Sequence, residues 1–197
     1  MVHSCPVLQV IVASTRPGRV GKSFGDWFVR VAEQHGGFEV EQIDLAQVNL
    51  PFMDEPKHPK LRDYQHQHTK DWSATIDRAD AYVFVTPEYN YGYNAVLKNA
   101  IDFLNQEWAD KAVSFVSYGG IAGGTRAVQQ LKQVVTTLRM VPIFESVNIA
   151  FAGTKLDENG RVTEDPLLDG AAVQTLDELL RLTAALRPDS VDTRDRG

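Results

Sequence analysis

Short apolar runs alternate along the chain with segments in which apolar residues recur every three or four positions. The runs are rich in β-branched residues and predict strands, whereas the wider spacing predicts helices. The predicted strands lie at 7–13, 38–45, 81–85, 112–117 and within 141–150. The predicted helices lie at about 20–35, 61–78, 95–105, 127–138 and 173–182. This alternation is typical of a parallel sheet with helices on both faces and right-handed crossovers.

The remaining segments read as one long loop and a tail. Three prolines within residues 49–60 predict an extended loop between the second strand and the second helix. The 197 residues suffice for one full hydrophobic core, and no internal repeat appears, so residues 1–186 are expected to form one domain. Residues 187–197 are polar and are expected to be a disordered tail.

Composition narrows the class of protein. Hydrophobic residues make up 43% and charged residues 23%, which is ordinary for a globular protein. The net charge of −6 argues against a nucleic-acid partner. The single cysteine, Cys5, excludes an internal disulfide framework. No apolar run is long enough to cross a membrane and no signal peptide is recognisable, so a cytoplasmic protein without a membrane partner is expected.

The segment after the third strand carries the strongest candidate chemistry. The apolar run stops at Pro87, polar residues follow, and a helix starts near Asn94, which is its expected N-cap. Open α/β sheets place ligands at this carboxyl end of a strand. Exposed amides, the side chain of Asn90 and three tyrosine rings suit a flat heteroaromatic ligand. The tyrosines are Tyr89, Tyr91 and Tyr93; packing at a subunit contact is the alternative for all three.

The turn between the first strand and the first helix is basic in an acidic chain. Residues 14–23 carry three cations, two glycines and two serines, with no acid before Asp26. Amides at a helix N-terminus attract anions, and arginine can grip a phosphate with paired hydrogen bonds. A solvated basic turn is the alternative. A loop of the Walker A type needs a glycine where Arg16 stands, so nucleoside triphosphates are not expected.

A glycine-rich turn follows the fourth strand at 119–124. It lacks the G-x-G-x-x-G spacing and the acidic residue of a dinucleotide-binding fold. A flexible turn is one interpretation. The other is a close approach to the ligand ring, with the following helix N-terminus favouring negative charge on that ring.

Three segments, in this order, resemble the NADPH-dependent FMN reductase family: 14–19, 87–90 with 97–102, and 117–127. The resemblance spans roughly residues 7–185. It implies a flavodoxin-like fold, that is, a doubly wound five-stranded parallel sheet in the order 2-1-3-4-5 with helices on both faces. It also implies FMN, NADPH or NADH, and a small-molecule electron acceptor such as a quinone, chromate or an azo dye.

The resemblance also implies a set of cofactor-binding residues. The first turn would bind the FMN phosphate through a hydroxyl, a guanidinium and main-chain amides, and the other two would border the ring. The expected residues are Ser14, Arg16, Arg19, Val20, Gly21, Lys22, Pro87, Glu88, Tyr89, Asn90, Ser117, Gly119 and Gly120. The family commonly has Ser where this chain has Arg19, which leaves the role of Arg19 open.

No catalytic side chain and no metal site are expected, because the flavin carries the redox chemistry. The five histidines show no ligand grouping. His66 and His68 stand two apart in a predicted helix and are expected to face different ways.

The expected function is an oxidoreductase that passes hydride from NADPH through FMN to quinone-like or other xenobiotic acceptors, or to FMN itself. The alternative is a non-catalytic flavodoxin-like electron carrier or an FMN-dependent interaction protein. Flavodoxin phosphate loops rely on hydroxyls, so Arg16 and Arg19 favour the enzyme. The helix at 95–104 is apolar on more than one stripe, with Ala95 and Phe103 outside the main one, and family members are dimers or tetramers. A homodimer or homotetramer is therefore expected.

Overall fold

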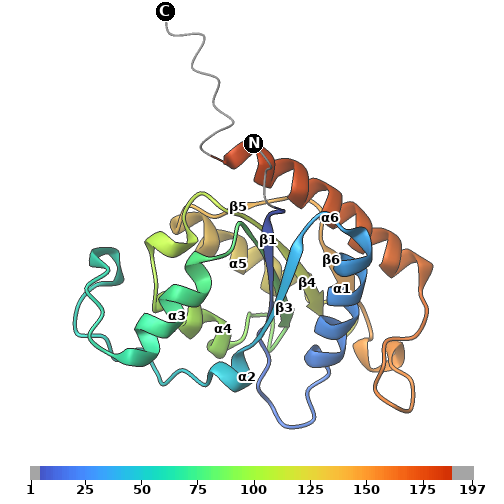
Figure 1. Cartoon of the computed structure of the whole chain (residues 1–197). Coiled ribbons are helices and arrows are strands. Elements are labelled where there is room, and N and C mark those ends of the chain that lie inside the picture. Colours follow the sequence, from blue (N-terminus) through green and yellow to red (C-terminus); the bar gives the residue numbers. More distant parts are fainter. Residues whose placement is uncertain (1–4, 188–197) are drawn as a thin grey trace, which may run out of the picture.

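A parallel sheet forms the centre of the computed structural model, which describes residues 5–187. Its strands are β1 (Val7–Val12), β2 (Glu39–Asp44), β3 (Ala81–Pro87), β4 (Ala112–Tyr118), β5 (Val141–Pro142) and β6 (Val147–Ile149). The order is β2-β1-β3-β4-β5, and β6 also pairs with β4 (Figure 1). Every pairing is parallel. The predicted order is confirmed.

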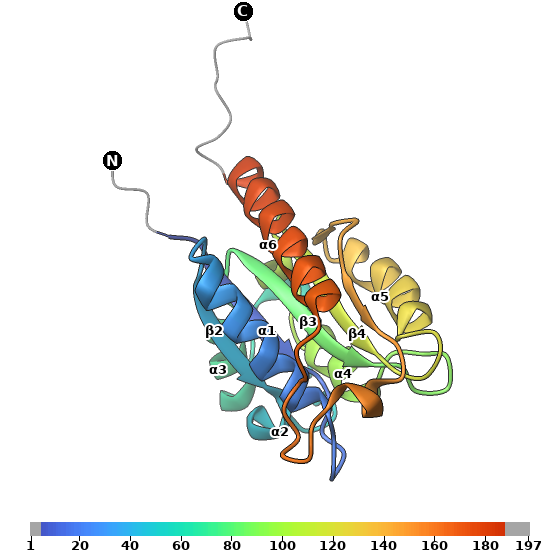
Figure 2. The ribbon, with the colours of Figure 1, turned by 90° about the vertical axis from the view of Figure 1, so that its right-hand side faces the viewer.

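Helices cover both faces of the sheet. One face carries α1 (Gly21–His35) and α6 (Pro166–Leu186), which lie side by side over it (Figure 2). The other carries α3 (Gln67–Asp77), α4 (Ala95–Asp102) and α5 (Thr125–Thr137). Two separate apolar clusters result, one under each layer. β3 and β4 are buried along their whole length, which explains their continuous apolar runs.

Local chemistry sets several element ends differently from the prediction. The fifth strand is split into β5 and β6. The ladder continues past Pro142, since Ile143 N donates to Val113 O at 3.0 Å, and it is interrupted at 144–146, where the Ser114 hydroxyl donates to Glu145 O at 2.7 Å. Leu45 does not end the second strand but begins the short helix α2 (Leu45–Val48), since the Asp44 side chain accepts a hydrogen bond from Ala46 N at 3.0 Å. The helix predicted over 61–78 begins only at Gln67, after the 3₁₀ turn η1 (Pro59–Leu61).

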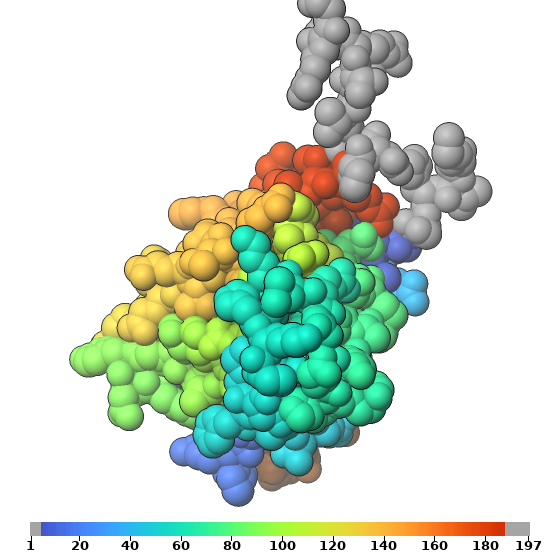
Figure 3. Space-filling model, turned by 90° about the vertical axis from the view of Figure 1, so that its left-hand side faces the viewer, coloured from blue at the N-terminus to red at the C-terminus, as the bar shows by residue number. Residues whose placement is uncertain are grey.

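The segment 49–66 packs across the face of the molecule beside α4 (Figure 3). At the end of this segment, the prediction that His66 and His68 face different ways is wrong. His66 precedes α3 as its N-cap residue, so the two imidazoles stack, with ring centroids 5.2 Å apart. His68 Nε2 lies 3.0 Å from a carboxylate oxygen of Asp54. No group of side chains in residues 5–187 has the arrangement of a metal site.

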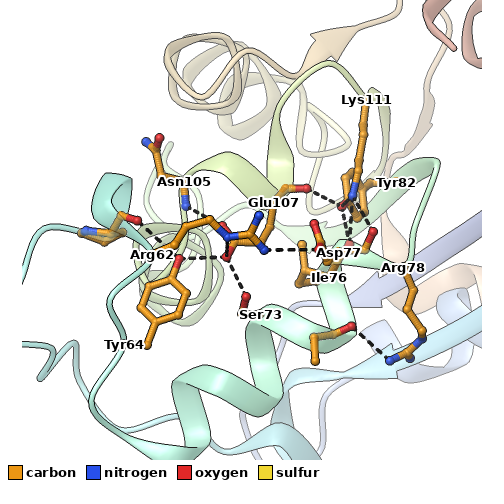
Figure 4. A network of polar contacts seen from close by, with 12 residues as sticks. Arg62, Tyr64, Ser73, Ile76, Asp77, Arg78, Tyr82, Asn105, Glu107 and Lys111 are labelled. Atoms are coloured by element: carbon orange, nitrogen blue, oxygen red, sulfur yellow. Dashed lines mark hydrogen bonds and ion pairs between the residues drawn. The ribbon is translucent and has the colours of Figure 1, made fainter. Parts of the chain in front are cut away.

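A buried carboxylate ties this segment to the rest of the fold. Glu107, in the 3₁₀ turn η2 (Gln106–Trp108), is fully buried. It accepts hydrogen bonds from Tyr64 Oη at 2.9 Å and from Ser73 Oγ at 2.6 Å (Figure 4). Arg62 Nε lies 3.3 Å from it. The nearby Lys111 ammonium donates to two main-chain carbonyls and to Tyr82 Oη.

No helix within the described residues is long and apolar enough to cross a membrane. The predicted cytoplasmic location is not tested by that feature and stays a prediction. Of the tail predicted to be disordered, residues 188–197 lie outside the described part of the chain.

Candidate cofactor site

The three predicted segments meet at the carboxyl edge of the sheet. Ala13 N donates to Val85 O at 3.0 Å and Glu88 N donates to Tyr118 O at 3.0 Å, so the ends of β1, β3 and β4 stand side by side. A Cβ built on Gly119 would lie 3.6 Å from Glu88 Cβ. Residues from about 14, 88 and 119 therefore share one rim.

Three polar features converge on the start of α1. The helix has no side-chain cap at Val20 and no acid in its first turn, so its first amides keep their hydrogen-bonding capacity. The Ser14 hydroxyl is buried and has no hydrogen bond of acceptable geometry to any residue in 5–187. A Cβ on Gly21 would overlap both Ser14 Oγ and Tyr118 Oη. Amides and two hydroxyls around a bare main chain are suited to an anion.

The phenol of Tyr118 is a site group that the sequence prediction missed. Its ring packs against Phe24, with centroids 5.2 Å apart, and burial raises the pKa of Tyr118 to about 12. The hydroxyl therefore stays protonated at neutral pH and can donate a hydrogen bond. Its position as the last residue of β4 is the signal that could have found it, because strand ends line this rim.

The three predicted cations have different surroundings. Arg16 is exposed and has no carboxylate partner among residues 5–187. Lys22 pairs with Asp26 one turn along α1. Arg19 forms two parallel bonds to Asp44, from Nη1 at 2.6 Å and from Nη2 at 2.5 Å. Of these three cations, Arg16 alone has no carboxylate partner within the described part of the chain.

The loop after β3 forms a two-residue turn. Tyr89 and Gly92 exchange hydrogen bonds of 2.9 Å in both directions. Asn90 and Tyr91 have φ values of 50° and 70°, the left-handed pair of a type I′ turn. The amides of Glu88 and Tyr89 are thus used within the protein, whereas those of Asn90 and Tyr91 have no main-chain acceptor in the described residues. The side chain of Asn90 is exposed at the tip of this turn.

Glu88 joins this turn to α5. Its carboxylate accepts from Arg126 N at 3.1 Å and pairs with the Arg126 guanidinium at 2.7 Å. That guanidinium lies 3.8 Å from the centre of the Tyr91 ring. The carboxylate of Glu88 therefore lies at the N-terminus of α5. The expectation that this helix end also favours negative charge on the ligand ring stays a prediction.

The α4 side of the turn shows one confirmed prediction. Asn94 caps α4, accepting from Leu97 N at 2.7 Å. Tyr93 is half-buried and packs against the core, whereas Tyr89 and Tyr91 are exposed.

The glycine-rich turn offers open space at one point. Ser117 Oγ is buried and hydrogen-bonded to Gly123 O at 2.7 Å and to Asn148 Oδ1 at 2.9 Å, so it holds the turn in shape. A Cβ on Gly120 would meet no atom within 4 Å. Two residues with exposed apolar side chains are next to Gly120 in the structure: Ile121 follows it in the chain, and Phe151 N donates to Gly120 O at 3.0 Å.

A sequence profile of the family described as NADPH-dependent FMN reductase matches residues 7–154, which include all three rim segments. The chain belongs to this family. It is accordingly an oxidoreductase whose cofactors are FMN and NAD(P)H.

Individual relatives agree with this assignment. An NAD(P)H-dependent FMN reductase of Schizosaccharomyces pombe is 42% identical over 137 residues, covering 68% of each chain. An NAD(P)H:quinone oxidoreductase of Solanum tuberosum is 29% identical over 169 residues, covering 81% of this chain and 85% of its own. Among solved structures, the flavoenzyme FerB, an NAD(P)H:(acceptor) oxidoreductase of Paracoccus denitrificans, superposes with a TM-score of 0.73 over 90% of this chain and 97% of its own. Its 21% identity shows a shared fold.

The residues at the rim fit the cofactor of the reductase family. A buried hydroxyl without a partner, uncapped amides and an unpaired guanidinium are the groups that a phosphate requires. The space above Gly120 and the exposed aromatic turn suit a flat ring.

Proposed function

We propose that this reductase transfers hydride from NADPH or NADH, through FMN held at the carboxyl rim, to a quinone-like or other small acceptor, or to FMN itself. The observation that carries the proposal is the pair of buried hydroxyls of Ser14 and Tyr118 beside the uncapped N-terminus of α1. The Ser14 hydroxyl has no hydrogen bond of acceptable geometry within the described residues, and an incoming phosphate would give it one.

The protein supplies binding and orientation at the phosphate end. The first amides of α1 and the Ser14 hydroxyl would donate to the phosphate, with Tyr118 Oη beside them as a third donor. Arg16 would add the charge, since its guanidinium is the one at this loop without a carboxylate partner in the described chain. Each charge-assisted bond of this kind contributes about 1.5–3 kcal/mol.

At the ring end, the turn at Asn90 and Tyr91 and the opening at Gly120 would border the tricyclic system. FMN, when bound, supplies the hydride-accepting and hydride-donating chemistry of the reaction. The exposed side chains of Tyr89, Ile121 and Phe151 provide an apolar surround for flat acceptors. The quinone oxidoreductases among the relatives support acceptors of this class.

The test is a titration of protein with FMN, followed by addition of NADPH or NADH under argon. We expect tight FMN binding and rapid bleaching of the flavin absorption band without any added protein. Arg16→Ala should bind FMN about tenfold to a hundredfold more weakly, the loss of one charge-assisted grip. Arg30→Ala, which removes an exposed arginine further along α1, is the matched control and should bind as wild type. Bleaching that needs a second protein would favour the electron carrier, and unaltered binding by Arg16→Ala would remove Arg16 from the site.

We also propose a homodimer through the face that carries α4 and the segment 49–53. Phe103, predicted to lie on a free face of α4, is fully buried within its own chain, so that part of the prediction is wrong. Ala95 and Val96 remain, and they line an apolar cavity of about 320 Å³ with Phe52, whose side chain is 86% exposed. Light scattering should give at least twice the chain mass of 21.9 kDa, and Phe52→Glu should lower it. A wild-type monomer would overturn the dimer.

A further inference from the structure

The two arginines of the phosphate loop have different surroundings, and the difference assigns them different tasks. Arg16 stands exposed at the tip of the loop. Arg19 turns back into the protein. Its side chain is 20% exposed, and the side chain of its partner Asp44 is 5% exposed. Three N–H groups of the Arg19 guanidinium are used within the protein: two on Asp44 and one on the carbonyl of Ser14.

These bonds connect points that are far apart along the chain. Ser14 O marks the start of the loop, and Arg19 N closes a turn on Arg16 O at 3.1 Å. Asp44 ends β2 and is itself held by Ala46 N at 3.0 Å, at the start of α2. Burial alone would raise the pKa of Asp44, but the bonds from Arg19 and Ala46 N hold it below its ordinary value. The carboxylate is therefore charged at neutral pH and fixed in position.

A guanidinium already paired with a buried carboxylate presents little net charge to a second anion. We infer that Arg19 is a positioning residue: through Asp44 and Ser14 O it holds the loop 14–20 in the shape that receives the FMN phosphate, and it is not itself the phosphate's charge partner. This inference rests on the proposed function. It makes Asp44, at the end of β2, part of the cofactor site.

The variant Asp44→Asn distinguishes two roles of Arg19: holding the loop in position and binding the FMN phosphate directly. The asparagine keeps the shape and can still accept from Ala46 N, but it loses the charge that orients Arg19. If Arg19 positions the loop, Asp44→Asn and Arg19→Lys should each weaken FMN binding about tenfold, and the double variant should bind no worse than either single one. If Arg19 instead grips the phosphate, Asp44→Asn frees it, and FMN binding should be unchanged or tighter.

Dissociation constants for FMN and for riboflavin are measured by flavin fluorescence below the unfolding temperature of each variant. Riboflavin lacks the phosphate, and the loop is proposed to contact only the phosphate end of FMN. The variants should therefore bind riboflavin nearly as wild type does, whereas general destabilisation would weaken the binding of both ligands. Asp110→Asn is the matched control, because Asp110 forms a similar two-oxygen pair with Arg139, at 2.8 Å to each oxygen, away from the rim. It should bind FMN as wild type.

Unchanged or tighter FMN binding by Asp44→Asn overturns the inference and leaves the proposed function intact. Wild-type protein that binds no FMN overturns both. If Asp44→Asn does not fold, Arg19→Lys provides the test, because lysine keeps the positive charge but cannot form the paired hydrogen bonds to Asp44. Normal FMN binding by Arg19→Lys then overturns the inference.

Discussion

Gly21, the first residue of α1, offers a direct measure of how closely the cofactor rim is packed. Its main chain is helical, so helix propensity alone favours alanine there by about 0.5–1 kcal/mol. The added Cβ, however, would overlap Ser14 Oγ and Tyr118 Oη and lie 3.1 Å from Tyr118 Cζ. The Tyr118 ring is only 5% exposed and packs on Phe24, so it cannot swing aside without moving the core.

Overpacking of this kind costs about 1–3 kcal/mol, which exceeds the gain from propensity. We expect Gly21→Ala to lower the free energy of unfolding by about 1–2 kcal/mol in urea titrations and to weaken FMN binding about tenfold or more. Gly170→Ala is the matched control, since Gly170 lies within α6 and a Cβ there meets no atom within 4 Å. It should raise stability by about 0.5–1 kcal/mol and leave FMN binding unchanged.

Tyr118→Phe removes the hydroxyl nearest the new methyl group and should partly restore the stability of Gly21→Ala. A Gly21→Ala variant that is as stable as wild type and binds FMN normally would refute the description of this rim as closely packed around a bare main chain.

Two further predictions concern the network of polar contacts around Glu107 and Lys111 (Figure 4). Burial lowers the pKa of Lys111 from 10.5 to about 8, a cost of about 3 kcal/mol that is present in full below pH 8 and fades as the pH rises toward 10.5. The stability of wild type relative to Lys111→Met should therefore increase between pH 8 and pH 10, and a pH-independent difference would contradict this. Glu107→Ala leaves the hydroxyls of Tyr64 and Ser73 without their acceptor and should lower the free energy of unfolding by about 2–4 kcal/mol, measured in urea. A loss below 1 kcal/mol would show that the buried carboxylate contributes little.

Local patterns in the sequence determined most of the architecture. The apolar runs placed β1 to β4 and the region of β5 and β6, and the cap at Asn94 and the left-handed Gly36 at the end of α1 follow from residue type alone. The three rim segments were also recognisable, because each is a continuous stretch whose residues act together. Element ends were less predictable where a single side chain decides them, as Asp44 does for α2.

The tertiary structure decided which side chains work together. Arg19 and Asp44 stand 25 positions apart, and Ser14 follows β1 whereas Tyr118 ends β4, so no spacing rule pairs them. They meet because parallel strands bring their carboxyl ends to one edge whatever their order in the chain. The same packing stacked His66 on His68, which helical spacing alone would have separated. The types of residue therefore determined which chemical groups are available at the rim. The order of the parallel strands in the sheet determined which of these groups contact one another.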